Sequence, residues 1–453
     1  MLSGGSFSET LRKSIHILMV SFALLLRWLS WPQAALLALV ALLHNWLLLP
    51  RYGRSRLYRS GDQLRGYPIG ILLYPLTILI LILIFRRRLD IVAAAWGLLA
   101  FGDGFATLIG TRFGRAKLPW NPHKSWAGSL AFLVAGAAGA SLLVWWTRFA
   151  GGREPWDPVA VLAHPLLAAA LASLLESLPS LIDDNLSVPL LAAGFLYCLG
   201  LIEPARLLGD SRLLASELLT GLGINLILSA AALWAGSVSW TAVAVGTATY
   251  TLLYAFLGPA GFLIGVAFFG LATLSTKLGL AHKQARGIAQ EEGGARGAKH
   301  VVANCSLAAF FGILAAGTSY PALFTLGAVA ALATAAADTC SSEIGKYLGR
   351  RTYLVTNFRA VPPGTEGAVS LEGTLAGLAA AALLAGLAWG MDLLAPAAAA
   401  IVIPAAFIGT SFESYLGAAL GSRHVYDNEV MNFLNTLVGG GAAMALAALL
   451  GVI

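Results

Sequence analysis

Apolar runs of about 17 to 25 residues follow one another along almost the whole chain. A helix of that length crosses the hydrocarbon core of a bilayer, roughly 30 Å thick, and satisfies its own backbone hydrogen bonds there. Only 11% of the 453 residues are charged, whereas soluble globular proteins contain about 25%. We therefore predict an all-α polytopic membrane protein with about 15 transmembrane helices in two related halves.

The basic residues indicate how the chain is oriented. If the N-terminus is cytoplasmic, the loops on that side hold most of the 29 Lys and Arg residues, in agreement with the positive-inside rule. We interpret the net charge of +7 as this topological bias and expect no nucleic-acid partner. The lipid bilayer is the predicted environment, and we place the protein in a bacterial cytoplasmic membrane with its active sites facing the cytoplasm.

One pattern of residues occurs twice. An Asp at the end of an apolar run is followed by Ile-Gly after 6 and 7 residues and by another Gly after 11. A Glu-Ser pair follows 73 residues after the first Asp and 75 after the second, and an Asp-Asn pair comes later in each copy. The positions are Asp103, Glu176 and Asp184-Asn185, then Asp338, Glu413 and Asp427-Asn428. Such repeats usually mark a duplicated functional unit, so we predict domains 1–210 and 211–453.

The first copy combines acids with a basic segment rich in glycine. An acid within a membrane helix is costly unless it is paired or lines a wet cavity. Carboxylates bind Mg²⁺, whereas Lys and backbone N–H groups hold phosphates, so this set suits a Mg²⁺–nucleotide complex. We predict metal-binding or catalytic roles for Asp103, Glu176, Asp183 and Asp184, and a catalytic, phosphate-holding role for Lys124. Predicted nucleotide contacts are Gly102, Gly104, Asn121, Ser125, Gly128, Ser129 and Asn185.

The second copy has hydroxyls, glycines and acids in the corresponding segment. We predict corresponding catalytic roles for Asp338, Glu343, Glu366, Glu372 and Glu413, with Asp338 and Glu413 also binding the metal. Predicted nucleotide contacts are Ser342, Gly364, Thr365, Gly367, Ser370 and Gly373. Simpler roles remain open in both copies. Asp103 could reach headgroup water, Asp184 could be a helix N-cap, and Ser370 could pack helices closely.

Several ordered motifs of the first half, over about residues 9–206, occur together in one known family. They are Arg12-Lys13-x-x-His16, Gly102-Asp103-Gly104-Phe105-Ala106, Asn121-x-x-Lys124-Ser125-Trp126-Ala127-Gly128-Ser129, and Glu176-Ser177-Leu178-Pro179 followed by Asp183-Asp184-Asn185-Leu186. This half resembles the phytol kinase and dolichol kinase family. The resemblance implies CTP-dependent phosphorylation of a long-chain isoprenoid alcohol. Ala127, as in phytol kinases, favours phytol or geranylgeraniol over dolichol.

The second half, from about residue 215 to 453, has its own set of motifs. They are Val302-Ala303-Asn304, Ala337-Asp338-Thr339-x-x-Ser342-Glu343-Ile344-Gly345, Pro363-Gly364-Thr365-Glu366-Gly367-Ala368-Val369-Ser370 and Glu372-Gly373-Thr374. This half resembles the phytyl-phosphate kinase family of plastids and its bacterial relatives, many of which have Asp at the position of Glu413. The resemblance implies phosphorylation of an isoprenoid monophosphate to the diphosphate. Together the halves imply a bifunctional fusion for salvage into prenylquinones, tocopherol or chlorophyll.

Two other classes of function remain open. A cytidylyltransferase that makes a CDP-lipid uses the same nucleotide and similar Asp and Lys loops. A secondary transporter also has internal repeats and buried acids, although its acids lie near the midplane of the membrane, whereas these cluster toward one face.

Overall fold

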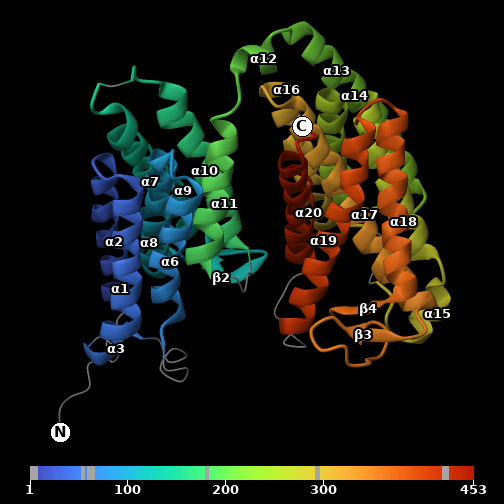
Figure 1. The fold of residues 1–453 in the computed structure, drawn as a ribbon, viewed down its shortest axis with the longest axis horizontal. Coiled ribbons are helices and arrows are strands. Elements are labelled where there is room, and N and C mark those ends of the chain that lie inside the picture. Colours follow the sequence, from blue (N-terminus) through green and yellow to red (C-terminus); the bar gives the residue numbers. More distant parts are fainter. Residues whose placement is uncertain are drawn as a thin grey trace. The chain divides into compact units, whose positions relative to one another are not determined.

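The computed structural model describes residues 9–52, 57–58, 67–152, 154–178, 183–290, 296–420 and 428–453. The chain forms two compact units, unit 1 (Met1–Gly200) and unit 2 (Leu201–Ile453) (Figure 1). The structural division follows Gly200, and the functional boundary that the sequence places after residue 210 stays a prediction.

Unit 1 consists of helices and one small hairpin. Its helical segments are α1 (Glu9–Leu18), η1 (Met19–Arg27), α2 (Trp31–Leu43), η2 (His44–Leu48), α3 (Leu49–Tyr52), α6 (Ile69–Ile84), α7 (Leu89–Gly97), η3 (Leu98–Asp103), α8 (Gly104–Phe113), α9 (Trp126–Val144), η4 (Trp145–Phe149), η5 (Val159–Ala163), α10 (His164–Ser177) and α11 (Asp184–Leu199). Strands β1 (Lys117–Leu118) and β2 (Asn121–Ser125) pair antiparallel between α8 and α9. Segments α7, η3 and α8 run on as one helix, Leu89–Phe113.

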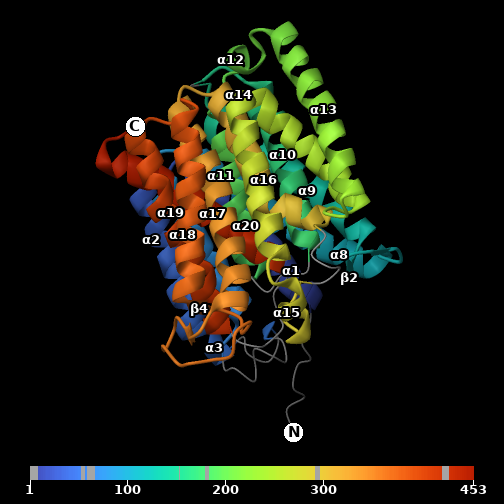
Figure 2. The same cartoon turned by 90° about the vertical axis from the view of Figure 1, so that its right-hand side faces the viewer.

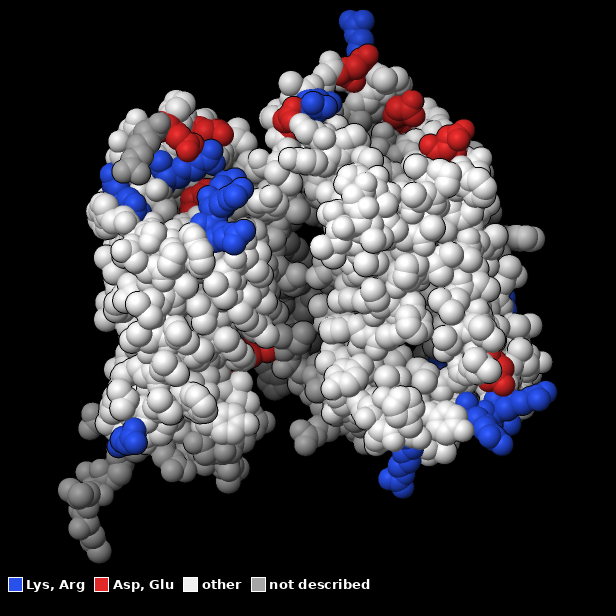
Figure 3. Space-filling model, in the orientation of Figure 1, with Lys and Arg blue, Asp and Glu red and all other residues white. Residues whose placement is uncertain are grey.

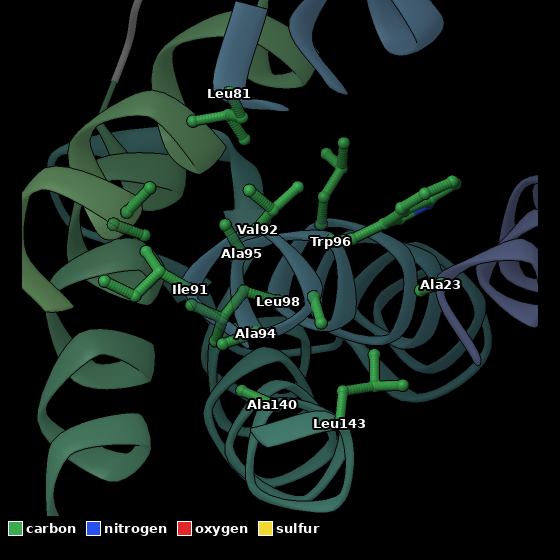
Figure 4. Close-up of a cluster of buried hydrophobic side chains, with 14 of the residues drawn as sticks. Ala23, Leu81, Ile91, Val92, Ala94, Ala95, Trp96, Leu98, Ala140 and Leu143 are labelled. Carbon is green, nitrogen blue, oxygen red and sulfur yellow. The ribbon is translucent and has the colours of Figure 1, made fainter. Parts of the chain in front are cut away.

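Helix α7 lies at the centre of the core of unit 1 (Figure 4). Its sequence is apolar on almost every side, and all of its residues from Asp90 to Gly97 are buried. A helix that is hydrophobic all round is expected in such a position, because it has no polar face to present to water. Val92 and Ala95 are fully buried in a cluster that includes Leu81 of α6 and Leu143 of α9.

Small residues set the distance between α7 and α9. A Cβ atom built on Gly97 would lie 2.9 Å from the backbone of Gly139. Helices in lipid gain little from hydrophobic burial against one another, so close backbone approach and van der Waals contact must hold them together. The Gly and Ala content of these helices is therefore a packing requirement.

Unit 2 has the same kinds of element. Its helices are α12 (Pro204–Leu208), α13 (Ser211–Trp234), α14 (Trp240–Lys277), α15 (Leu280–Ala285), α16 (Ala298–Gly317), α17 (Pro321–Leu348), α18 (Leu371–Gly390), α19 (Pro396–Leu420) and α20 (Asn428–Leu450). Strands β3 (Thr352–Leu354) and β4 (Ala368–Ser370) pair antiparallel. Helix α17 packs against α14, α16, α18, α19 and α20, and Figure 2 shows the β3–β4 hairpin and α15 at one end of the unit.

Helix α14 folds back on itself at Gly258. That residue has φ +69° and precedes Pro259, a combination that ends a regular helix. The Tyr250 hydroxyl donates a hydrogen bond to the Gly265 carbonyl at 3.0 Å, although 15 residues of straight helix would span about 22 Å. The two arms match the separate spans expected at 239–257 and 259–276.

The all-α polytopic membrane class is confirmed. Within the described residues, eleven helices are long and apolar enough to cross a membrane, and Ile69–Ile84 and Asp184–Leu199 are shorter apolar helices. The expectation of about 15 spans counted the two arms of α14 separately and included a first span that falls within α1 and η1. On the face seen in Figure 3, charged side chains gather mostly toward the two ends of each unit and leave an apolar band between them.

Candidate active sites

Unit 1 contains a serine that joins the hairpin to the helix after it. Ser125 ends β2 with an extended backbone and is the N-cap of α9, where its Oγ accepts a hydrogen bond from the Gly128 N–H at 3.2 Å. The same Oγ packs on Gly110, where a Cβ would lie 3.4 Å away, and a Cβ on Gly114 would clash with it. The glycines 7 and 11 residues after Asp103 are therefore needed to seat this cap.

Unit 2 contains the same device at the corresponding positions. Ser370 ends β4, is the N-cap of α18 and accepts from the Gly373 N–H at 3.1 Å. A Cβ on Gly345 or on Gly349 would lie 3.1 Å from the Ser370 Oγ. A motif read only as two spaced glycines in the sequence is thus one local fold built twice: a helix, a hairpin and a serine-capped helix.

These contacts give a structural role to four residues that were predicted to bind nucleotide: Ser125, Gly128, Ser370 and Gly373. Both serines are buried, with 4% and 7% of their surface exposed, and their hydroxyls are used in capping. The N-terminus of each capped helix carries partial positive charge, which favours a nearby phosphate. Nucleotide contact at these positions stays a prediction.

The carboxylate of Asp103 is held by two residues of α1. Lys13 Nζ lies 2.5 Å from Asp103 Oδ2, and His16 Nε2 lies 3.5 Å from the same oxygen. Only 7% of the Lys13 side chain and 9% of the Asp103 side chain are exposed, so this is a buried ion pair. The Arg12-Lys13-x-x-His16 motif noticed in the sequence thus supplies the partners of Asp103, although neither Lys13 nor His16 was among the predicted site residues.

Aromatic residues fix the position of His16. Its ring contacts the Tyr74 ring edge-on at 4.5 Å between centroids, and its Nε2 lies 3.1 Å from the Leu99 carbonyl oxygen. The Trp96 indole N–H donates to the Tyr74 hydroxyl at 2.7 Å. Tyr74 and Trp96 lie in apolar runs, where the sequence carries no signal that would separate them from ordinary core residues.

The backbone around Asp103 departs from regular α-helix. Asp103 ends η3, a π-helical segment, and such segments occur frequently at functional sites. Its neighbours are packing residues: a Cβ on Gly102 would lie 2.8 Å from the Phe132 ring, and one on Gly104 would clash with Ile17. Both glycines face neighbouring helices, and the nucleotide contact predicted for them stays a prediction.

A second cluster of unit 1 is centred on Lys124 of β2. Its ammonium group pairs with Glu176 at the end of α10 and lies 3.5 Å from Asp184 Oδ2 at the start of α11. Burial lowers the pKa of Lys124, but Glu176, Asp184 and Asp103 together raise it above its ordinary value. Lys124 therefore stays protonated, and the three acids belong to one electrostatic site.

The remaining predicted residues of unit 1 support this cluster. Asp183 is the N-cap of α11, since its Oδ1 accepts from the Asn185 N–H at 3.0 Å; Asp184, for which capping had been an alternative, is instead the first helical residue and faces Lys124. The Asn121 side chain donates to the Ser177 carbonyl at 3.1 Å. The Ser129 carbonyl accepts from Ser173 at 2.9 Å.

Unit 2 encloses a cavity of about 630 Å³ between α16, α17, the hairpin, α18, α19 and α20. The predicted residues that line it are Asp338, Ser342, Gly364, Thr365, Glu366, Gly367, Ser370, Gly373 and Glu413. Its lining also includes Arg296, His300 and Lys346, which were not predicted. The volume is in the usual range for a small-molecule site.

Two carboxyl groups face each other in this cavity. Asp338 of α17 and Glu413 of α19 lie within hydrogen-bonding reach of one another, and the Asn435 amide donates to Glu413 Oε2 at 2.5 Å. Two carboxylates at such a distance cannot both be charged unless a proton or a cation lies between them. The pair therefore fits either a shared proton or a bound metal ion.

Glu343 and Glu372 were predicted to act with this pair but are not among the residues that line the described cavity. The Glu343 side chain is fully buried, and its oxygens lie 2.5 Å from Lys283 Nζ and 3.3 Å from Lys346 Nζ. Lys283 also donates to the carbonyls of Ser275 and Thr276, so all parts of this ion pair are satisfied. Glu343 joins α15 to α17, and Glu372 lies in the first turn of α18.

Metal binding can be tested against the donors present. Among the described residues, no three His, Cys, Asp or Glu side chains gather closely enough to hold a metal ion by themselves. Mg²⁺ commonly binds one or two carboxylates together with substrate phosphates, so the Asp338–Glu413 pair fits that ion. Asp427 lies outside the described residues, whereas its neighbour Asn428 lines the cavity.

Both units thus bury acids beside cations within apolar helices, which defines a polytopic membrane protein with two candidate sites for an anionic or metal-bound ligand. Residues 223–440 match the family described as integral membrane protein DUF92. An uncharacterized membrane protein of Synechocystis sp. is 39% identical over 204 residues, which cover 44% of this chain and 78% of that protein. The chain belongs to this family of integral membrane proteins.

Two plant proteins are also similar to parts of the chain. The chloroplastic protein VTE6 of Arabidopsis thaliana is 38% identical over 203 residues, which cover 43% of this chain and 61% of VTE6. A probable chloroplastic phytol kinase of Glycine max is 34% identical over 188 residues, which cover 40% of this chain and 61% of that protein. The chain therefore spans less than two thirds of either plant protein. No solved structure matches it.

Proposed function

We propose that the chain is a bifunctional, CTP-dependent isoprenoid kinase. Unit 1 phosphorylates phytol or geranylgeraniol to the monophosphate, and unit 2 phosphorylates that monophosphate to the diphosphate. The observation that carries the proposal is the serine-capped helix built twice, each time beside an acid that occupies the same place in the repeat. Similarity to VTE6 and to a probable phytol kinase supports this class of reaction.

The two reactions are related steps. In unit 1 the alcohol oxygen forms a bond to the γ-phosphorus of CTP, the bond between the β,γ-bridging oxygen and that phosphorus breaks, and CDP leaves. The hydroxyl proton passes to a carboxylate of the site. In unit 2 a phosphate oxygen of the monophosphate attacks the γ-phosphorus in the same way. The first product is the second substrate, which gives a tandem chain a chemical rationale.

The residues present suit phosphoryl transfer, which depends mainly on positioning and charge neutralisation. In unit 2, Asp338 and Glu413 would hold Mg²⁺, which when bound neutralises charge on the phosphates of CTP. Lys346 lines the same cavity and offers a cation to those phosphates. The glycines of the hairpin loop, Gly364 and Gly367, let the backbone approach them closely.

Unit 1 offers the same kinds of group in different pairings. Lys124 is placed to move from Glu176 and Asp184 to a nucleotide phosphate, which would free those two carboxylates for Mg²⁺. Asp103, held by Lys13 and His16, orients the hydroxyl of the alcohol. The isoprenoid chain enters sideways from the bilayer, and CTP enters from the cytoplasm of a bacterial cell.

The test is to incubate purified protein with geranylgeraniol and CTP labelled at the α- or the γ-phosphate. A kinase transfers only the γ-label, first into a monophosphate and then into a diphosphate. A cytidylyltransferase would incorporate the α-label into lipid. A protein that neither binds labelled CTP nor transfers label would leave the secondary transporter as the better explanation.

A further inference from the structure

Arg296 is a buried cation in the wall of the unit 2 cavity. It lies just before α16, only 7% of its surface is exposed, and it lines the cavity. Its backbone is fixed on both sides, because its N–H donates to the Ser237 carbonyl and its carbonyl accepts from the Ser239 N–H, each at 3.1 Å. The side chain therefore projects from a rigid support.

The guanidinium group has no counterion in the part of the chain that the structure describes. The buried lysines differ in this respect: Lys13 pairs with Asp103, and Lys283 pairs with Glu343. Burial lowers the pKa of Arg296, but a guanidinium stays protonated at any physiological pH. A buried charge without a partner is costly, so a site of this kind is completed by an anion from outside the chain.

We propose that Arg296 binds the phosphate of the isoprenoid monophosphate and so makes unit 2 selective for a phosphorylated acceptor. This inference rests on the proposed function. CTP is common to both reactions, and the acceptors differ by one phosphate, which carries about −1.5 to −2 charge. The two lysines that hold the acids of unit 1, Lys13 and Lys124, are both engaged by carboxylates, whereas Arg296 is an additional cation that faces the cavity.

The layout of the cavity separates the two phosphates. The wall formed by the β3–β4 loop and α18 carries the glycines and hydroxyls that suit a nucleotide. Arg296 belongs to another wall, with His300 and Asn304 of α16. The carboxyl pair, Asp338 and Glu413, lines the same cavity. The planar fork of Arg donates two parallel hydrogen bonds to a phosphate, which positions the acceptor as well as attracting it.

The experiment compares Arg296→Gln and Arg296→Lys with the wild-type chain in detergent. Arg286→Gln, which removes an exposed Arg from the end of α15, is the matched control. Steady-state kinetics would give KM for geranylgeranyl monophosphate and for CTP, and thermal shift would report binding of each ligand without turnover. We expect Arg296→Gln to weaken monophosphate binding at least about tenfold and to leave CTP binding within about twofold. Arg296→Lys should fall between, because it keeps the charge and loses the fork.

Two results would overturn the inference: a loss of CTP affinity with monophosphate binding retained, or no change in either. If Arg296→Gln does not fold, Arg296→Lys decides, since it must still weaken monophosphate binding more than CTP binding. A wild-type chain that binds the monophosphate through Arg296 but transfers no label would refute the kinase proposal alone. A wild-type chain that does not bind the monophosphate refutes the role of Arg296.

Discussion

The two units share a backbone device but balance its charges differently. In unit 1 every acid of the site lies against a lysine, Asp103 against Lys13 and both Glu176 and Asp184 against Lys124. In unit 2 the corresponding acids, Asp338 and Glu413, face each other. Duplication has therefore preserved the geometry that presents the acids and changed what neutralises them, as expected if one unit receives a neutral alcohol and the other an anion.

The hairpins differ in the same direction. Only Pro119 and Trp120 separate β1 from β2, whereas residues 355–367 separate β3 from β4 and supply much of the cavity lining. That longer loop is anchored at Gly367, which has φ +70°, and a Cβ there would clash with the α19 backbone at Ala418. The extra loop encloses a cavity next to a device that otherwise matches that of unit 1.

The largest expected effect separates the two activities. Asp103→Asn should reduce alcohol phosphorylation by at least about 100-fold and leave monophosphate phosphorylation intact, and Asp338→Asn should do the reverse, because each removes the charge of one site. Product analysis with γ-labelled CTP measures both steps. Asp157→Asn and Asp392→Asn, at exposed positions of the two units, are matched controls. Equal loss of both steps in either variant would disprove separate sites.

A smaller effect concerns stability and compares two lysines. Lys283→Met should destabilise the protein by about 3–5 kcal/mol, because it leaves Glu343 buried with only Lys346 nearby. Lys124→Met should cost less stability while abolishing alcohol phosphorylation, since 31% of its side chain is exposed. Thermal unfolding in detergent gives the ranking. The double variant Lys283→Met/Glu343→Leu should recover much of the loss, and failure to do so would mean that the pair is not the source of the effect.

The smallest expected effect examines the shared device directly. Ser125→Ala and Ser370→Ala each remove one N-cap, which is worth about 1 kcal/mol. Similar losses of thermal stability are expected from both, and Ser216→Ala, at an exposed serine of α13, should change little. A loss confined to one of the two serines would show that the units do not use the device alike.

Much of the architecture was predictable from local features of the sequence. The apolar runs predicted membrane helices, and Gly258-Pro259 predicted that 239–257 and 259–276 are separate arms, because both signals depend on residues close in the chain. The glycines 7 and 11 residues after each Asp were likewise visible as a repeat. Their purpose was not, since it requires knowing that Ser125 and Ser370 return to the same face of the helix.

The sequence by itself determined the membrane class and the repeated motif, whereas the tertiary structure decided which charges meet. Lys13 lies 90 residues from Asp103, and Lys283 lies 60 residues from Glu343. Glu343 matched its motif as well as Asp338 did, yet it faces a lysine in the protein interior while Asp338 faces the cavity. The reason is physical: helical periodicity and apolar length are local properties, but the partner of a buried charge depends on the rotation and approach of neighbouring helices.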